Sequence, residues 1–279
     1  MKCAWKELLA ILPPWLRGGV DRQGRDTLQE IRLRRDHSVI LIRSDGNLQL
    51  PRKPKQEDLQ YVINAACHYS PWTATSTAQG YLTAPGGHRI GLCGEALLRN
   101  GAMDGIRTVT SMNIRVARDF PGISGNLWLR NESILILGPP GCGKTTLLRD
   151  LIRQRSLREN VSVVDQRDEL FPVAANFEPG ANTDILTGCS KVQGVSQVLR
   201  VMSPDCIAVD EITAPEDCDA LIQAGWCGVS LLATAHAASF SDLFTRPIYA
   251  PLAKSKLFGT AVILRRDKSW YTERIDLCR

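Results

Sequence analysis

The chain has 279 residues, of which 44% are hydrophobic and 23% are charged, a composition ordinary for a globular protein of one large or two modest domains. No stretch approaches the roughly 20 consecutive apolar residues that cross a bilayer, and the nine cysteines contain no Cys-x-x-Cys pair, which argues against a membrane-spanning helix, a zinc ribbon and a disulfide framework. The net charge of +5 is mild, so it permits an anionic partner such as a membrane surface or nucleic acid without requiring one.

The region up to about residue 120 has the pattern of a small α+β domain. Its first apolar stretch is interrupted by Glu7 and by Pro13-Pro14, so it predicts a short amphipathic helix rather than a signal peptide, and we expect a cytoplasmic protein. The rest of the region predicts a strand pair over 28–50 around a turn at Asp45-Gly46, a helix over 55–70, two strands around a glycine turn over 80–98, and a further strand over 107–118.

Residues 119–133 are rich in Pro, Gly, Ser and Asn, and predict a connection between an N-terminal α+β domain over 1–120 and a second domain over 121–279. In the second domain, short apolar runs alternate with helical stretches. This pattern predicts an α/β fold whose mainly parallel sheet is covered on both faces. The strands are predicted over 133–138, 161–166, 206–211 and 229–236, followed by a closing hairpin over 261–266 and 270–277.

The segment GPPGCGKT begins at residue 138 and matches the phosphate-loop pattern G-x-x-x-x-G-K-[ST] in full, between a predicted strand and a predicted helix. Its glycines let successive backbone N–H groups turn toward phosphate oxygens. We expect Lys144 to reach the β- and γ-phosphates of ATP and Thr145 to ligate Mg²⁺. Cys142 is at a helix N-terminus, where a thiol pKa can be lowered, but we interpret it as a small residue that the loop tolerates. The expected nucleotide-binding residues are Gly138, Pro139, Pro140, Gly141, Cys142, Gly143, Lys144, Thr145 and Thr146.

Polar residues follow three other predicted strands, at the sheet edge where ligands of open α/β sheets bind. In CIAVDE, we expect Asp210 to hold Mg²⁺, through water, and Glu211 to polarise the attacking water. In LLATAH, His236 would sense the γ-phosphate or order that water. Asp165 and Arg167 follow a third strand and line the same cleft. The alternatives are acids that merely cap a strand and a histidine with a structural role.

These motifs together resemble one known family. GPPGCGKTTLLRDLIR, VVDQRDE, TDILTGCSKVQGVSQVLRVMSPDCIAVDEI and GVSLLATAHA, with LQEIRLRRDHSVIL and GYLTAPGGHRIGLCGEA before them, are similar to the stage III sporulation protein AA family of endospore-forming bacteria, from about residue 28 to 266. The resemblance implies a RecA-like P-loop NTPase core and a cytoplasmic ATPase of the mother cell, similar to type II and type IV secretion motors. It also implies a homo-oligomeric ring, usually a hexamer. This ring would energise a channel complex between mother cell and forespore, together with membrane proteins of the same operon, at the membrane periphery.

The chain departs from the family pattern at two places. Gln166 stands where the family has the glutamate of VDER, and Thr213-Ala214-Pro215 stands where the family tends to Gly-Arg. Neither departure touches Lys144, Thr145 or the acids at 210 and 211, so we expect hydrolysis to survive.

Ring motors commonly complete their sites with an arginine from a neighbouring subunit, which contributes ~10³–10⁵ in rate. The candidates are Arg89, Arg107, Arg115 and Arg200, of which we favour Arg89 and Arg200. The alternative for each is a solvated surface arginine.

Three other functions are compatible with the phosphate loop. A nucleic-acid-dependent ATPase is suggested by Arg32, Arg34 and Arg35 on an alternating strand, but the aromatic residues that stack on bases are missing there, so we do not expect nucleic acid as a partner. A nucleotide-gated scaffold with little turnover fits poorly with intact acids at 210 and 211. A small-molecule kinase lacks an evident lid or acceptor pocket in the sequence.

Overall fold

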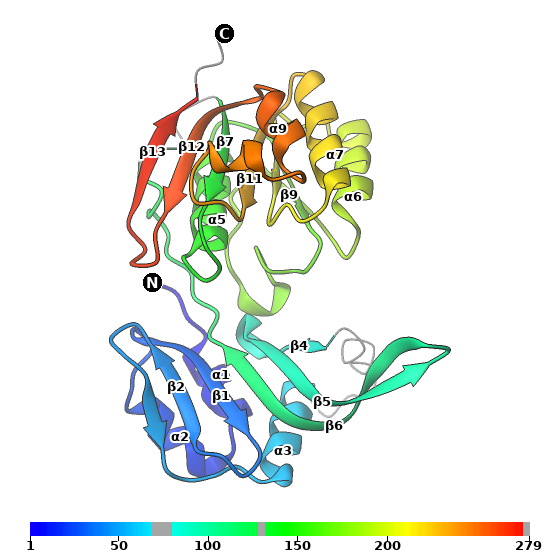
Figure 1. Ribbon diagram of the computed structural model, residues 1–279. Helices are drawn as coiled ribbons and strands as arrows, with labels where there is room; N and C mark the ends of the chain where they lie inside the picture. The colour runs from blue at the N-terminus through cyan, green and yellow to red at the C-terminus, as the bar shows by residue number, and fades with distance from the viewer. Residues whose placement is uncertain (68–79, 126, 128–131, 276–279) are drawn as a thin grey trace. The chain divides into compact units, whose positions relative to one another are not determined.

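The computed structural model describes residues 1–67, 80–125, 127 and 132–275, which form two compact units (Figure 1). The N-terminal unit comprises Met1–Asp119 with Val173–Asn176, and the C-terminal unit comprises Phe120–Pro172 with Phe177–Arg279. Residues 68–70 of the predicted helix, 276–277 of the predicted last strand, and 126 and 128–131 of the predicted connection lie outside the described residues.

The N-terminal unit is an antiparallel sheet with helices packed against it. Its strands run in the order β3-β2-β1-β6-β5-β4, and α1, α2 and α3 share one apolar core with them. The elements are α1 (Trp5–Ile11), α2 (Pro14–Asp21), β1 (Leu28–Arg34), β2 (Val39–Arg43), β3 (Leu48–Leu50), α3 (Gln56–Ala66), β4 (Tyr81–Thr83), the 3₁₀ turn η2 (Pro85–Gly87), β5 (Arg89–Arg99) and β6 (Ala102–Arg115). In Figure 1, β5 and β6 continue beyond the sheet as a two-stranded ribbon.

Two details of this unit differ from the sequence prediction. The predicted first helix ends before Pro13-Pro14, and an unpredicted helix, α2, begins at Pro14, since proline lacks only an N–H that the first turn of a helix does not use. The predicted strand pair over 28–50 is a set of three strands. A first turn, with Asp36 at a φ of 61°, separates β1 from β2, and the Asp45-Gly46 turn then connects β2 to β3.

His88, which follows the glycine turn, is fully buried and joins two distant segments of the unit. Its Nε2 lies 2.8 Å from the carbonyl oxygen of Ala4, and its Nδ1 lies 3.1 Å from the backbone nitrogen of Ala117. Only the neutral ring with its proton on Nε2 satisfies both, because Ala4 offers an acceptor and Ala117 a donor. Burial lowers the pKa of His88 and outweighs the Ala4 bond and the charge of Glu7, which raise it.

The C-terminal unit is a seven-stranded sheet in the order β13-β12-β7-β11-β10-β8-β9, and every neighbouring pair is parallel except β12–β13. The elements are β7 (Ser133–Leu137), α5 (Lys144–Arg155), β8 (Val161–Asp165), β9 (Thr183–Thr187), α6 (Lys191–Val201), β10 (Cys206–Val209), α7 (Pro215–Trp226), β11 (Ser230–Ala235), α8 (Asp242–Thr245), α9 (Ala250–Lys254), β12 (Phe258–Leu264) and β13 (Trp270–Arg274). A 3₁₀ turn, η4 (Val173–Ala175), lies between β8 and β9 in the chain and belongs to the N-terminal unit.

The predicted α/β pattern is confirmed in this unit, with one addition. β7, β8, β10 and β12 are buried along their whole length, as expected for parallel strands between two helical layers. β9 was not predicted, because its sequence TDILT lies at the sheet edge, is largely exposed and has no continuous apolar run. Since β7, β8, β10 and β11 are parallel, the loops that follow them meet at one edge of the sheet.

None of the helices in the described part of the chain combines the length and the apolar character that a bilayer crossing needs.

We expect the N-terminal unit to lose stability as the pH falls below 6.5. The pKa of His88 is below its ordinary value of 6.5 in the folded protein, so the unfolded chain takes up a proton there first. His88→Gln should cost about 1–3 kcal/mol near neutral pH, because buried partners lose their hydrogen bonds, and should flatten the pH dependence. Urea unfolding at pH 7.5 and 5.5 measures both effects.

The matched control is His37→Gln, since His37 is exposed and its Nδ1 lies 2.8 Å from the carbonyl oxygen of the neighbouring Arg35. Equal acid sensitivity in the His88 and His37 variants would contradict the assignment.

Candidate nucleotide-binding site

The loop between β7 and α5 has the backbone that a phosphate loop requires. Gly138, Gly141 and Gly143 have φ values of 152°, 74° and 105°, which favour glycine. A Cβ at Gly138 would lie 2.7 Å from the carbonyl oxygen of Leu264 and 2.8 Å from Sγ of Cys142, so the loop packs too closely there for any side chain. α5 begins at Lys144, immediately after this turn, and directs its N-terminal N–H groups toward the loop.

Lys144 is folded back over the loop. Its Nζ donates to the carbonyl oxygens of Gly138 and Pro139, each at 2.9 Å, and to Nδ1 of His236 at 3.1 Å. All three ammonium hydrogens therefore have acceptors. Burial lowers the pKa of Lys144, against the charges of Cys142, Asp210 and Glu211. An incoming phosphate would replace acceptors that the lysine already has.

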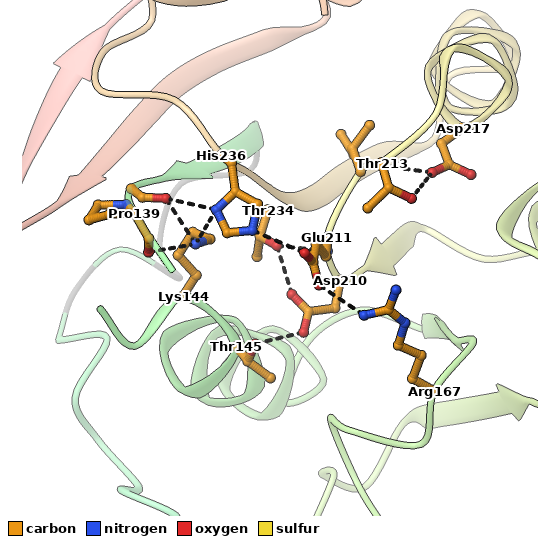
Figure 2. Close-up of polar contacts among 12 residues, drawn as sticks. Pro139, Lys144, Thr145, Arg167, Asp210, Glu211, Thr213, Asp217, Thr234 and His236 are labelled. Atoms are coloured by element: carbon orange, nitrogen blue, oxygen red, sulfur yellow. Dashed lines mark hydrogen bonds and ion pairs between the residues drawn. The ribbon is translucent and has the colours of Figure 1, made fainter. Parts of the chain in front are cut away.

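Asp210, directly after β10, lies between two hydroxyl groups from neighbouring elements. Thr145 on α5 donates to Oδ2 at 2.7 Å, and Thr234 on β11 donates to Oδ1 at 2.7 Å (Figure 2). Burial raises the pKa of Asp210, although both hydrogen bonds lower it. A desolvated carboxylate beside a threonine hydroxyl suits a hard cation, so the predicted magnesium ligands Thr145 and Asp210 are brought together.

Glu211 is held by side chains from two other strands. Its Oε1 lies 3.0 Å from Nε2 of His236 on the β11 side, and its Oε2 lies 3.4 Å from Nη1 of Arg167 on the β8 side (Figure 2). Nδ1 of His236 lies 3.1 Å from Nζ of Lys144, a donor, and 3.3 Å from the carbonyl oxygen of Gly138, an acceptor. When Nδ1 accepts from Lys144, Nε2 carries the proton that it donates to Glu211. Burial raises the pKa of Glu211, but the His236 bond and the charges of Arg167 and Lys144 bring it below its ordinary value.

The backbone at Glu211 is strained, with a φ of 52°. Its N–H donates to Oγ1 of Thr234 at 2.7 Å, and the N–H of Ile212 donates to the Thr234 carbonyl at 2.9 Å. Thr234 thus fixes both acids, through its hydroxyl and its backbone. The sequence places Thr234 and Arg167 at strand ends that line the cleft, but it assigns neither of them a role. The signal for Thr234 was a polar residue in an apolar strand, and Arg167 gave none beyond its position.

The loops on either side of Glu211 are connected through a buried ion pair. Nζ of Lys191, at the start of α6, lies 3.6 Å from Oδ2 of Asp217 and donates to Oε1 of Gln166 at 3.2 Å. The same Asp217 oxygen accepts the N–H groups of Thr213 and Ala214, at 3.0 and 3.2 Å. Gln166 therefore keeps a hydrogen bond to Lys191 although it lacks the family's negative charge.

The base of the β8 loop is anchored to α5. Asp165 accepts the N–H groups of Glu169 and Leu170 at 2.9 and 2.7 Å, and Arg149 on α5 donates to both carbonyl oxygens of that pair. Burial raises the pKa of Asp165, which the backbone N–H donors and Arg149 partly offset. This anchoring supports Arg167 beside Glu211.

The remaining predicted residues, Arg89, Arg200 and Cys142, have other surroundings in their own units. Arg89 belongs to the N-terminal unit, where its guanidinium lies 4.1 Å from the ring centroid of Tyr81. Arg200 is exposed in the last turn of α6, the end that leads into the start of β10, whereas the acids follow the end of that strand. Cys142 is buried, and burial raises the pKa of its thiol, which fits a structural residue better than a reactive one.

Comparison with known proteins identifies the family. A family model described as "Sporulation stage III, protein AA" matches residues 6–273. The chain belongs to the stage III sporulation protein AA family. The stage III sporulation protein AA of Bacillus subtilis (strain 168) is 35% identical to it over 283 residues, which cover 94% of this chain and 91% of the relative. The resemblance seen in the motifs is thereby confirmed, and the family match extends beyond it at both ends.

Solved structures share the fold of this family member. The ATPase DotB of Legionella pneumophila has a TM-score of 0.62 at 15% identity, over 94% of this chain and 79% of that one. The pilus retraction motor PilT with bound ADP has a TM-score of 0.58 at 13% identity, over 87% and 76%. The predicted fold, a mainly parallel α/β core preceded by a small N-terminal part, is confirmed, and the ATPase DotB and the pilus retraction motor PilT share it.

Replacing Thr234 by valine should lower the free energy of unfolding of the C-terminal unit by about 1–3 kcal/mol, because the N–H of Glu211 would be left buried without its acceptor. Thr234→Ser keeps the hydroxyl and should lose much less. Denaturant unfolding of the three proteins tests this, and equal losses in both variants would mean that the methyl group rather than the hydroxyl is responsible.

Proposed function

We propose that this protein is an ATP-hydrolysing motor of the secretion-ATPase type that energises assembly of, or transport through, a sporulation channel between mother cell and forespore. One observation carries the proposal: a phosphate loop, a Thr145–Asp210 pair and an ionised Glu211 converge at one edge of a parallel sheet. The sporulation part is supported by family membership.

The phosphate loop and Lys144 would bind the triphosphate of ATP. The glycine turns and the start of α5 supply N–H donors, and Lys144 exchanges its carbonyl and His236 partners for phosphate oxygens. The residues that we propose for this role are Gly138, Pro139, Pro140, Gly141, Cys142, Gly143, Lys144, Thr145 and Thr146.

Thr145 and Asp210 would hold Mg²⁺. They fit it because the hydroxyl already donates to the partly buried carboxylate, and a nearby cation favours the ionised form of a desolvated acid. Within the described residues no group of three His, Cys, Asp or Glu side chains forms a metal cage, which suits an ion whose other ligands are phosphate oxygens and water. When bound, Mg²⁺ neutralises charge on the β- and γ-phosphates.

Glu211 would accept the proton of the attacking water. Its lowered pKa keeps it ionised, and Thr234, His236 and Arg167 hold its backbone and both carboxylate oxygens. His236 also contacts Lys144, so a phosphate that draws Lys144 away changes the hydrogen bonding of the ring that holds Glu211. This contact would link the presence of the γ-phosphate to the hydrogen bond by which His236 holds Glu211, the proposed catalytic base.

We further propose that the protein works as a hexameric ring in the mother-cell cytoplasm, peripheral to the membrane and in contact with channel proteins there, with domains over 1–120 and 121–279. Arg200 supports a ring, because in its own chain it lies at the sheet edge opposite to Glu211 and is exposed for a neighbour. Arg89 remains the second candidate for this role.

Glu211→Gln should reduce ATP turnover by about 100-fold or more while ATP binding is retained, because the amide cannot accept the proton of water. Lys144→Ala should instead abolish binding, since it removes the cation that faces the β- and γ-phosphates. Steady-state hydrolysis and equilibrium binding of ATP with Mg²⁺ measure the two effects. Retained turnover in Glu211→Gln, or unchanged ATP affinity in Lys144→Ala, would overturn the proposed chemistry.

If Arg200 completes a neighbour's site, Arg200→Ala and Glu211→Gln should each be nearly inactive alone, and Arg200→Ala should lower the rate of ATP hydrolysis by roughly a thousandfold. A mixture of the two variants should regain activity. The mixture contains sites with an intact Glu211 and an intact Arg200 from different chains. Hydrolysis is measured with the mass of the assembly, with and without ATP.

A mixture without activity would exclude Arg200, and the same test then applies to Arg89→Ala. A strict monomer under every nucleotide condition would contradict the ring. Strong stimulation of hydrolysis by single-stranded DNA would favour the nucleic-acid-dependent ATPase instead.

A further inference from the structure

The strand order of the C-terminal unit determines which end of a nucleotide on the phosphate loop would lie toward which strands. β7, which carries the phosphate loop, has β11 and β10 on one side and β12 and β13 on the other. The groups at the γ-phosphate end, Asp210, Glu211 and His236, all follow β10 or β11. A triphosphate whose γ end lies there crosses the loop with its α-phosphate, ribose and base toward β12.

The end of β12 is in contact with the phosphate loop. A Cβ at Gly138 would lie 3.3 Å from Cβ of Leu264, and a Cβ at Gly143 would lie 3.9 Å from Cδ2 of Leu264. The side chain of Leu264, which is buried, therefore covers the β12 side of the loop. In Figure 1, the β12–β13 turn lies at the same edge of the sheet as the loop that leads into α5.

Trp270 is the partner of Leu264 across the hairpin. Directly opposed residues of an antiparallel pair lie on the same face, with Cβ atoms about 4.5–5.5 Å apart. Trp270 therefore lies on the same face of the hairpin as Leu264, the face that contacts the phosphate loop. It belongs to β13, one strand further from β7 than Leu264. The ribose and base of a loop-bound nucleotide extend over this position.

The indole of Trp270 is available to a ligand. It is 38% exposed, and within the described residues its side chain makes no hydrogen bond or aromatic contact. Its neighbour Tyr271 differs, because the guanidinium of Arg265 lies 5.0 Å from its ring centroid. The connecting turn carries Arg265, Arg266 and Lys268 against the single acid Asp267, which suits an anionic ligand.

We propose that Trp270 is the nucleobase platform of this protein, on which the base of the nucleotide stacks while the loop holds the phosphates. The inference rests on the proposed function, since it assumes a nucleotide on the phosphate loop. Stacking depends on the π-face rather than on hydrogen-bonding edges, so it distinguishes large bases from small ones better than one purine from another. The substrate class is therefore purine nucleotides, with GTP bound nearly as well as ATP.

The test compares a ligand with a base to one without. Trp270→Ala should weaken ADP binding about tenfold, the lower part of the range for loss of one stacked base, while inorganic tripolyphosphate binds as before. Trp270→Phe should retain most of the affinity for ADP, because a smaller ring still stacks. Trp226→Ala is the matched control, since Trp226 is 74% exposed at the far end of α7, and it should change neither affinity.

Unchanged tripolyphosphate binding also shows that each variant is folded. Two results in Trp270→Ala would overturn the nucleobase platform: an unchanged affinity for ADP, or an equal loss of affinity for ADP and tripolyphosphate. Neither result would contradict phosphate binding by the loop. An unaltered protein that binds neither ligand would overturn the proposed function, and this inference with it.

Discussion

The site depends on one partly buried carboxylate, Asp210, and on the two threonines that bond it. Thr145 comes from α5 and Thr234 from β11, so a single side chain joins three elements that are far apart in sequence. Burying a carboxylate is unfavourable unless it is hydrogen-bonded or paired with a cation. The arrangement therefore fixes the start of α5 against the sheet, and it leaves a desolvated charge that the proposed Mg²⁺ would compensate.

The parts of the fold that could be predicted are those with a local signal. The phosphate loop and the buried strands were predicted because glycine spacing and continuous apolar runs are properties of short segments. β9 and α2 were not predicted. β9 is a polar edge strand, and α2 begins at Pro14, which was interpreted as an interruption rather than as the start of a helix.

In the site, the phosphate-loop motif and strand alternation together place Lys144, Thr145, Asp210, Glu211 and His236 at one edge. Arg167 was placed at that edge as well, but its contact with Glu211 and the Lys191–Asp217 pair could not be predicted, because they depend on which loops become neighbours after folding. The same holds for Trp270, whose position follows from its register with Leu264. The arginines at 89 and 200 show the limit most plainly, since the role proposed for them in another chain's site would leave no trace in their own surroundings.

The three hydrogen bonds of Lys144 have a consequence for the proposed turnover cycle. Since the ammonium group already has three acceptors, nucleotide entry would exchange two neutral carbonyl oxygens and an imidazole nitrogen for charged phosphate oxygens. The exchange would favour binding, because hydrogen bonds between two charged groups are the stronger ones. When product leaves in that cycle, the same acceptors would bind the lysine again, so the resting geometry would return without a separate folding step, as suits a machine that must cycle repeatedly.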